Sequence, residues 1–243
     1  MRVELLGAYI DALNMEQTVD RAADFVKSGR PHHIITLNPE YLYRAQREKA
    51  LLDLANSADL VTPDGTGIVW ACNIAGSPVP ERVTGIDLML HLCAKGEHQG
   101  WRVFLLGAAP GVAEEAGQRL KQQHPGLTIV GTYHGYFTDS ESGRIAEMIR
   151  EANPHLLFVA LGAPRQEQWI AKYQPQMGVP VAMGVGGSFD VVSGRKQRAP
   201  KWTQQLKIEW LYRLVKEPSR IKRQLVLPKF VMLVLKTYRL GRK

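Results

Sequence analysis

Asp64 is the residue whose type and surroundings are best suited to chemistry. It stands between Pro63 and Gly65, directly after the apolar run Ala58–Thr62. A carboxylate at the end of a buried strand projects into the space beyond the sheet, where it can take a proton from a substrate hydroxyl within the limit set by its low intrinsic pKa. The competing interpretation is a turn aspartate or the N-cap of the next helix. The sequence alone leaves both open.

Four other polar residues have a similar double interpretation. Thr36 and Asn38 follow an apolar run and are either loop polar groups or ligands to a bound sugar. Arg82 precedes a helical pattern and is either the partner of an anion or part of a surface ion pair. Gln166 lies in the first turn of a helix that begins at Pro164. It either binds hydroxyls or phosphates of a ligand or is simply a polar side chain in the solvated first turn of a helix.

Several glycines lie in short loops after apolar runs, and such loops can cradle phosphate because a helix N-terminus offers free N–H groups and a partial positive charge. Their spacing matches neither the dinucleotide-binding fingerprint G-x-G-x-x-G nor the phosphate loop G-x-x-x-x-G-K-[ST]. Tight turns that require glycine are the plainer explanation. The glycines that we take as candidates for substrate contact are Gly65, Gly107, Gly162, Gly186 and Gly187.

A metal site is not expected. The seven histidines show no ligand spacing, and the chain contains no Asp-x-Asp pair. Cys72 and Cys93, the two cysteines, lie in apolar helical stretches and are expected to be buried thiols. A nucleotide-sugar enzyme built in this way needs arginines and helix dipoles, in place of a divalent ion, to stabilise a departing diphosphate. We therefore predict neither a metal nor a cofactor.

The elements that must position these residues alternate between apolar runs and helical patterns. The apolar runs are 33–36, 58–62, 102–106, 156–161 and 179–183, with 128–131 as a further candidate strand. The helical patterns include 40–48, 67–74, 112–123, 165–173 and 188–192. This alternation predicts an α/β fold, Rossmann-like, with a mostly parallel sheet and helices on both faces. In such a sheet the ligand lies beyond the carboxyl ends of the strands, which is where the loops named above fall.

Charge divides the chain into two parts. The formal net charge is +8, but residues 1–193 carry a net −5 and residues 194–243 a net +13. We therefore expect a catalytic core over residues 1–194 and a basic appendage over residues 195–243. Such asymmetry indicates an anionic partner, either a membrane surface or nucleic acid.

The appendage has the pattern of basic amphipathic helices. Residues 202–217 carry an apolar stripe that ends at Pro218, and a later apolar run, Phe230–Leu235, is flanked by Lys229 and Lys236. This run is too short to span a bilayer, and it suits a helix that lies in the membrane interface. Packing of the appendage on its own body and contact with nucleic acid are the alternatives. The chain start lacks the pattern of a signal peptide, so we expect a cytoplasmic or peripheral protein.

Seven short motifs occur in order along nearly the whole chain. They are Pro63-Asp-Gly-Thr-Gly67, Glu81-Arg-Val-Thr-Gly85, Gly131-Thr-Tyr-His-Gly-Tyr-Phe137, Gly162-Ala-Pro-Arg-Gln-Glu167, Gly184-Val-Gly-Gly-Ser-Phe-Asp190, Arg198-Ala-Pro200 and Glu209-Trp-Leu-Tyr-Arg213. In combination they closely resemble the WecG/TagA/CpsF glycosyltransferase family. The resemblance implies transfer of a sugar from a UDP-sugar to an undecaprenyl-diphosphate-linked saccharide in cell-envelope or exopolysaccharide biosynthesis. It also implies a peripheral enzyme on the inner face of the bacterial plasma membrane.

The resemblance assigns expected roles to individual residues. Asp64 and Thr36 fall on the family's catalytic positions, and Asp64 is expected to be the general base of an inverting displacement. The other expected substrate contacts are Asn38, Arg82, Gln166, the glycines named above, Gly135, and three arginines of the appendage, Arg213, Arg220 and Arg223. One departure is that the proline that follows this threonine in teichoic-acid members is displaced here to Pro39.

Two other classes of function compete with this prediction. A nucleotide-binding oxidoreductase is disfavoured because the dinucleotide fingerprint is missing. A non-catalytic nucleic-acid-binding module is disfavoured because the body of the chain is acidic. The donor sugar, the acceptor saccharide and whether the chain forms a homo-oligomer are left open by the sequence.

Overall fold

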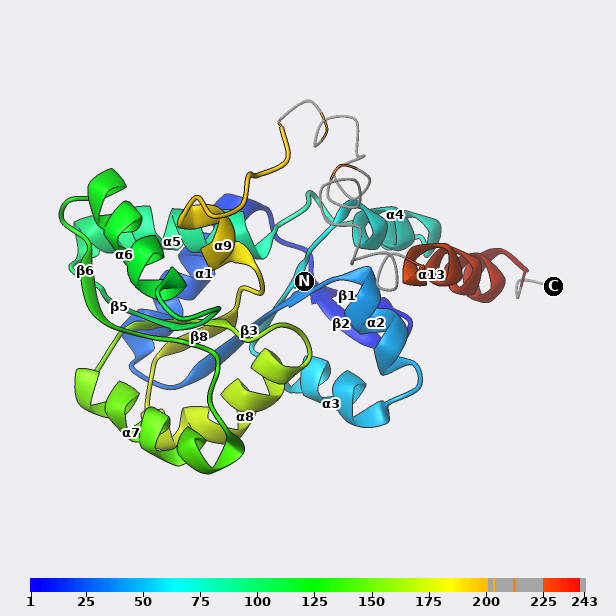
Figure 1. Ribbon diagram of the computed structural model, residues 1–243. Coiled ribbons are helices and arrows are strands. Elements are labelled where there is room, and N and C mark those ends of the chain that lie inside the picture. The colour runs from blue at the N-terminus through cyan, green and yellow to red at the C-terminus, as the bar shows by residue number, and fades with distance from the viewer. Residues whose placement is uncertain (201–202, 204–211, 213–224, 241–243) are drawn as a thin grey trace.

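The computed structural model describes residues 1–200, 203, 212 and 225–240 (Figure 1). Within these residues the centre of the molecule is a six-stranded parallel sheet with the strand order β4-β3-β8-β7-β5-β6. Its strands are β3 (His32–Leu37), β4 (Leu60–Pro63), β5 (Arg102–Gly107), β6 (Thr128–Tyr133), β7 (Leu156–Ala160) and β8 (Val181–Gly184).

Helices cover both faces of this sheet. One face carries α1 (Met15–Ser28), α5 (Gly85–Gln99), α6 (Val112–Gln123) and α9 (Ser188–Val192), as Figure 1 shows above the sheet. The other face carries α7 (Ser142–Ala152), α8 (Arg165–Met177), α2 (Pro39–Ala45) and α3 (Lys49–Ser57). Successive strand residues point to opposite faces, so Ile34 packs with α1 and α5 whereas Ile35 packs with α2 and α3. Burial on both sides explains why the strands are almost continuously apolar.

An antiparallel hairpin, β1 (Arg2–Leu5) and β2 (Ala8–Asp11), extends the core beside α3 and α4 (Thr66–Ile74). Its four-residue strands are too short to give a clear periodic signal, and the sequence analysis did not identify them. The hairpin is joined to β4 because the Asp11 carboxylate accepts the backbone N–H of Val61 at 2.9 Å. Leu5, Ala8 and Ile10 are fully buried in the same cluster.

The end of the described chain packs on the core. Helix α13 (Val226–Leu235) continues into a π-helical turn, η3 (Lys236–Leu240), and α13 lies against α2 and α4. Phe230 and Val234 are buried in the cluster that holds the N-terminal hairpin. The Tyr238 hydroxyl accepts the backbone N–H of Leu6 at 2.8 Å. Packing on its own body, one alternative for the appendage, is therefore present in this part of the chain.

The predicted fold class is confirmed, and the boundaries of α6 and α9 match the predicted ranges. The helix expected over residues 202–217 lies outside the described residues, so it stays a prediction. The division into a core over 1–194 and an appendage over 195–243 is likewise an expectation that the structure does not test. None of the described helices is long and apolar enough to cross a bilayer.

Candidate functional site at the carboxyl edge of the sheet

The loops that follow β3 and β4 lie side by side. Thr36 pairs with Thr62 and Leu37 pairs with Pro63, and the Asp64 N–H donates to the Leu37 carbonyl at 2.9 Å. The register therefore places Asp64 next to Asn38, directly beyond the sheet. The next strand, β8, leads into α9 on one face whereas β3 leads into α2 on the other. In this architecture ligands bind in the crevice between neighbouring loops that diverge to opposite faces, so the carboxyl edge between β3 and β8 is where we expect the crevice of the site.

Asp64 does not occupy the N-cap position of the helix that follows it. Gly65 is the N-cap of α4, with a φ of 95° that favours glycine. A Cβ at Gly67 would lie 2.8 Å from Cγ of Pro39, so the starts of α4 and α2 pack closely. The N-cap interpretation of Asp64 is therefore wrong, and its half-buried side chain is held at the edge beside the β3 loop.

Asn38 is an N-cap. Its Oδ1 accepts the backbone N–H of Tyr41 at 2.9 Å, and Pro39 supplies the first helical residue of α2. The side-chain oxygen of Asn38 thus has the structural role that the sequence left open. Contact between Asn38 and a sugar stays a prediction.

Thr36 lies beneath the first turn of α5. Its side chain is 8% exposed, and a Cβ on Gly85 would approach the Thr36 Oγ1 to 3.3 Å and the Gly184 carbonyl oxygen to 3.7 Å. Gly85 therefore allows the N-terminus of α5 to sit over the ends of β3 and β8. The partial positive charge of this 15-residue helix falls at the crevice.

Arg82 is brought to the edge by backbone contacts of its neighbours. The Val83 N–H donates to the Pro63 carbonyl at 3.1 Å, and the Thr62 hydroxyl donates to the Val83 carbonyl at 3.2 Å. The Glu81 carboxylate accepts the backbone N–H of Met15 at the start of α1. The segment that carries Arg82 is therefore fixed both to β4 and to α1.

The carboxylate of Asp87, in the first turn of α5, interacts with two arginines. Asp87 accepts hydrogen bonds from the Thr84 hydroxyl at 2.6 Å and from the Arg198 guanidinium at 2.5 Å. Partial burial opposes ionisation of Asp87, but these hydrogen bonds and the charges of Arg198 and Arg82 hold its pKa below the ordinary value. Asp87 is thus an anion at neutral pH that is bonded to Arg198 and feels the positive charge of Arg82.

Gln166 lies between the loops after β7 and β8. Its Oε1 accepts the backbone N–H groups of Gly162 at 3.1 Å and Gly186 at 3.0 Å, and its side chain is 3% exposed. Gln166 is therefore not a solvent-exposed side chain of the first helical turn, and that interpretation is wrong. The N–H groups of these two glycines, which the sequence suggested for phosphate, donate to Gln166.

Two other candidate glycines are required by close packing. A Cβ on Gly107, whose φ is 128°, would lie 2.5 Å from the carbonyl carbon of Ala160 in the neighbouring strand. Gly135 donates its N–H to the Ala108 carbonyl at 2.8 Å, and a Cβ there would lie 3.2 Å from the Ala108 nitrogen. Both support the tight-turn explanation. Gly187 precedes α9 at the same edge.

Arg213, Arg220 and Arg223 lie outside the described residues. Sequence reasoning from the residue types overlooked Asp87 and Arg198, and Glu81 as an anchor of the Arg82 segment. Arg198 and Glu81 stand in two of the short motifs, and this was the signal that could have found them.

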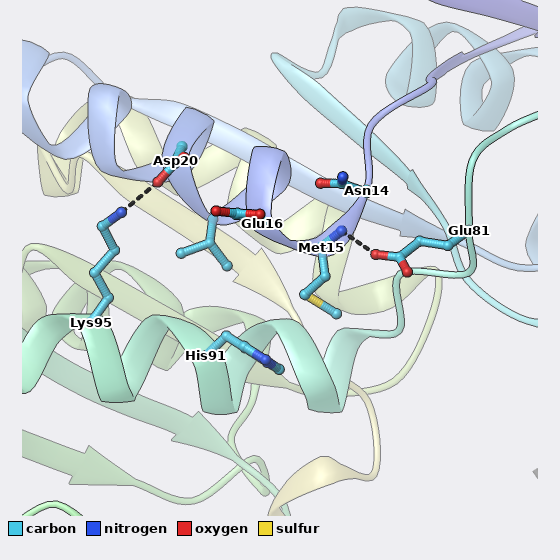
Figure 2. A pocket seen from close by; sticks show the side chains of 8 residues that line it. Asn14, Met15, Glu16, Asp20, Glu81, His91 and Lys95 are labelled. Atoms are coloured by element: carbon cyan, nitrogen blue, oxygen red, sulfur yellow. Dashed lines mark hydrogen bonds and ion pairs between the residues drawn. The ribbon is translucent and has the colours of Figure 1, made fainter.

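A second hollow of about 520 Å³ lies between α1 and α5 (Figure 2). Figure 2 shows that Lys95 bridges to Asp20 across its rim, and that Glu81 reaches Met15 at its other end. None of the residues predicted for catalysis or binding lines it. Within the described part of the chain, no group of three or more His, Cys, Asp or Glu side chains is placed to hold a metal ion.

Comparison with known proteins identifies the family. The model described as "Glycosyl transferase WecG/TagA/CpsF family" matches residues 3–243. The chain is 40% identical over 219 residues to the N-acetylglucosaminyldiphosphoundecaprenol N-acetyl-beta-D-mannosaminyltransferase of Bacillus spizizenii, covering 90% of this chain and 84% of that protein. It is 36% identical over 241 residues to the Staphylococcus aureus (strain MW2) protein of the same name, covering 98% and 94% of the two chains. The protein therefore belongs to the WecG/TagA/CpsF family of glycosyl transferases.

Proposed function

We propose that the protein transfers an N-acetylmannosamine-type sugar, or a related hexose, from a UDP-sugar to an undecaprenyl-diphosphate-linked saccharide. The relatives named above carry this sugar and this class of lipid acceptor in their names and match over nearly the whole chain. The observation that carries the proposal is the position of Asp64, which is beside Asn38 at the carboxyl edge and not at a helix cap. A proton acceptor at this place is what glycosyl transfer to a hydroxyl requires.

The chemistry is a single displacement. Asp64 takes the proton of the acceptor hydroxyl as its oxygen attacks the anomeric carbon, and the bond from that carbon to the diphosphate oxygen breaks to release UDP. The new glycosidic bond has the inverted configuration. An α-linked donor gives a β-linked product in this way, in keeping with the β-linkage in the relatives' names.

Charge on the departing diphosphate is stabilised by cations of the chain. Arg82 and the N-terminus of α5 lie at the carboxyl edge, and Asp87 holds Arg198 nearby. Arg213, Arg220 and Arg223 are proposed to join them from the appendage. With these cations the transfer proceeds without a metal ion.

Attachment to the membrane is proposed to use the outer face of α13. Phe230 and Val234 face the core, whereas Leu225, Val231 and Met232 are exposed by 57%, 38% and 62%. Apolar residues on the open face of a helix with exposed Lys229 and Lys236 are typical of a segment that lies in the interface of an anionic membrane. This face would hold the enzyme on the inner leaflet, where its lipid-linked acceptor is.

Release of UDP tests the proposal. Purified protein is incubated in EDTA with a panel of UDP-sugars and an undecaprenyl-diphosphate-linked N-acetylglucosamine acceptor, beside Asp64→Ala. We expect acceptor-dependent UDP release from one donor, lost in Asp64→Ala. Release that requires added Mg²⁺ or Mn²⁺ would contradict the metal-independent mechanism, and no release from any donor would contradict the proposed acceptor or donor class. A binding titration with UDP alone separates these two cases.

A further inference from the structure

Gln166 and Glu167 form a buried polar pair behind the crevice. The Gln166 Nε2 donates to the Glu167 Oε1 at 2.8 Å, and the Glu167 side chain is 1% exposed. Among the described residues, the other carboxyl oxygen of Glu167 has no hydrogen-bond partner. Burial raises the pKa of Glu167, so the uncharged acid is favoured. Burial and the nearby Glu167 carboxyl group both raise the pKa of Tyr41 on α2.

The arrangement of the glycines is explained by this pair. Gly162 and Gly186 have left-handed φ values of 79° and 53°, and both N–H groups point to the same Gln166 oxygen. Gly184 ends β8 where a Cβ would lie 2.7 Å from Cδ of Gln166, so only glycine leaves room for the amide. One side chain thus fixes the turns after two neighbouring strands.

The effect extends to the predicted site through the end of β8. The Gly184 carbonyl lies next to Gly85 in the first turn of α5, and Gly85 in turn lies against Thr36. A shift of the β8 end would therefore move Thr36 and the α5 N-terminus relative to Asp64. Gln166 is 3% exposed, and both polar atoms of its amide are engaged, Oε1 with Gly162 and Gly186 and Nε2 with Glu167.

We propose that Gln166 and Glu167 are positioning residues, whose bonded side chains hold the β7 and β8 loops in the arrangement that shapes the crevice, and that neither contacts the substrate. The inference rests on glycosyl transfer as the measured activity, and its structural part does not depend on the donor or acceptor proposed above. It differs from the role that the family resemblance suggested for Gln166.

Exchanging the two groups separates positioning from substrate contact. In Gln166→Glu the two carboxyl groups must share a proton, so the bond between them is kept at low pH and lost at high pH. We expect kcat/KM of this variant to fall about tenfold or more, relative to wild type, between pH 6 and pH 8.5. The double variant Gln166→Glu/Glu167→Gln restores a donor at position 167 and should recover most of the lost activity with a wild-type pH profile. Gln168→Glu, which adds the same charge on the exposed side of α8, is the matched control.

The opposing outcomes are distinct. A folded double variant as inactive as Gln166→Glu would mean that Gln166 touches the substrate. A single variant with wild-type activity and pH profile would show that the pair does not position the site. Amide hydrogen exchange of the unliganded wild type adds a readout without activity: slow exchange at Gly162 and Gly186 is expected, and fast exchange at both would overturn the inference even if the variants fail to fold. Protected glycines together with an inactive wild type would instead contradict only the proposed donor or acceptor.

Discussion

At the scale of single residues, the surroundings of each ionisable group decide what it can do. Asp64 is half-buried at the open edge of the sheet, whereas Glu167 is enclosed and its pKa is raised by burial. His33 is 7% exposed in the first part of β3, and burial lowers its pKa to about 4, although the nearby charge of Asp59 acts in the opposite direction. Asp64 thus stands at the open edge of the sheet, whereas Glu167 and His33 are enclosed.

Replacing Asp64 tests it as the general base. Asp64→Asn keeps the size of the side chain but cannot take a proton, so we expect turnover to fall by about 10²- to 10⁴-fold. Donor binding should change little, because the base acts on the acceptor. Steady-state UDP release and calorimetric binding of UDP measure the two quantities. Asp24→Asn, on the exposed face of α1, is the matched control, and turnover of Asp64→Asn within a fewfold of this control would exclude the role.

His33 predicts a pH dependence of stability. Its pKa is about 4 in the folded protein and near 6.5 in the unfolded chain, so the unfolded chain binds the proton first as pH falls. The stabilisation is complete above pH 6.5 and is lost toward pH 4. Between pH 7.5 and pH 5 this amounts to about 2 kcal/mol.

Urea unfolding of wild type and His33→Gln at both pH values isolates this contribution. Glu167 acts with the opposite sign, because its raised pKa costs stability as pH rises above its ordinary value. That contribution is common to both proteins, so it cancels in the comparison. We expect the free energy of unfolding to fall by about 2 kcal/mol more in wild type than in the variant, and equal pH slopes would refute the assignment.

At the scale of elements, the first turn of α5 joins the site to the first residues of the appendage. Thr84 caps the helix, Gly85 packs on Thr36, and Asp87 pairs with Arg198. A second pair, Arg195 with Glu115 on α6, holds the same segment through two hydrogen bonds of 2.7 and 2.8 Å. The segment 195–198 is thus held to two helices of the core.

The two pairs should differ in strength. The Asp87–Arg198 pair is the less exposed, and Asp87 also has the Thr84 hydroxyl, so a double-mutant cycle with Asp87→Asn and Arg198→Gln should give a coupling of about 1 kcal/mol. The exposed Glu115–Arg195 pair should give about 0.5 kcal/mol or less in the corresponding cycle. Urea unfolding of the single and double variants measures both. A larger coupling for Glu115–Arg195 would mean that Asp87 is not the stronger attachment of segment 195–198 to the core.

At the scale of the whole molecule, the uneven charge and the position of α13 belong together. Within the basic part of the chain, helix α13 packs on α2 and α4, the two helices that begin at the loops of Asn38 and Asp64 (Figure 1). Because Phe230 and Val234 face the core, Val231 and Met232 on the other side of α13 are exposed, and this is the face proposed to meet the membrane. Removal of residues 195–243 would uncover part of the core, so surface substitutions give the cleaner experiment.

Charges on the open face of α13 should release the protein from membranes. With Val231→Asp/Met232→Asp we expect binding to vesicles that contain anionic lipid to weaken tenfold or more, because a carboxylate in the interface opposes both apolar burial and the anionic surface. Vesicle co-sedimentation at constant salt measures this. Tyr9→Asp, at an exposed aromatic of the N-terminal hairpin, is the control. Undiminished binding of the double variant would place the membrane contact elsewhere.

The local pattern of the sequence determined the sheet and the edge at which its motifs gather. Apolar runs of strand length alternating with helical patterns suffice for a parallel α/β fold, because burial on both faces leaves a signal within each segment. Asp64, Asn38 and Gln166 each lie in a segment that follows an apolar run. Because the strands are parallel, these segments all fall at the carboxyl edge of the sheet.

Tertiary structure alone decided which long-range contacts these segments make. Gln166 accepts a hydrogen bond from the N–H of Gly186, which is twenty residues later in the chain. Arg198 pairs with Asp87, and α13 packs on α2 and α4. Each contact joins segments that are separate in the sequence, and each depends on the distances that the folded sheet imposes between loop ends. A polar residue beside a glycine-rich turn has the same local pattern whether it is open to solvent or bonded to the backbone behind it, so only the fold could show that Gln166 is enclosed and Asp64 is half-buried.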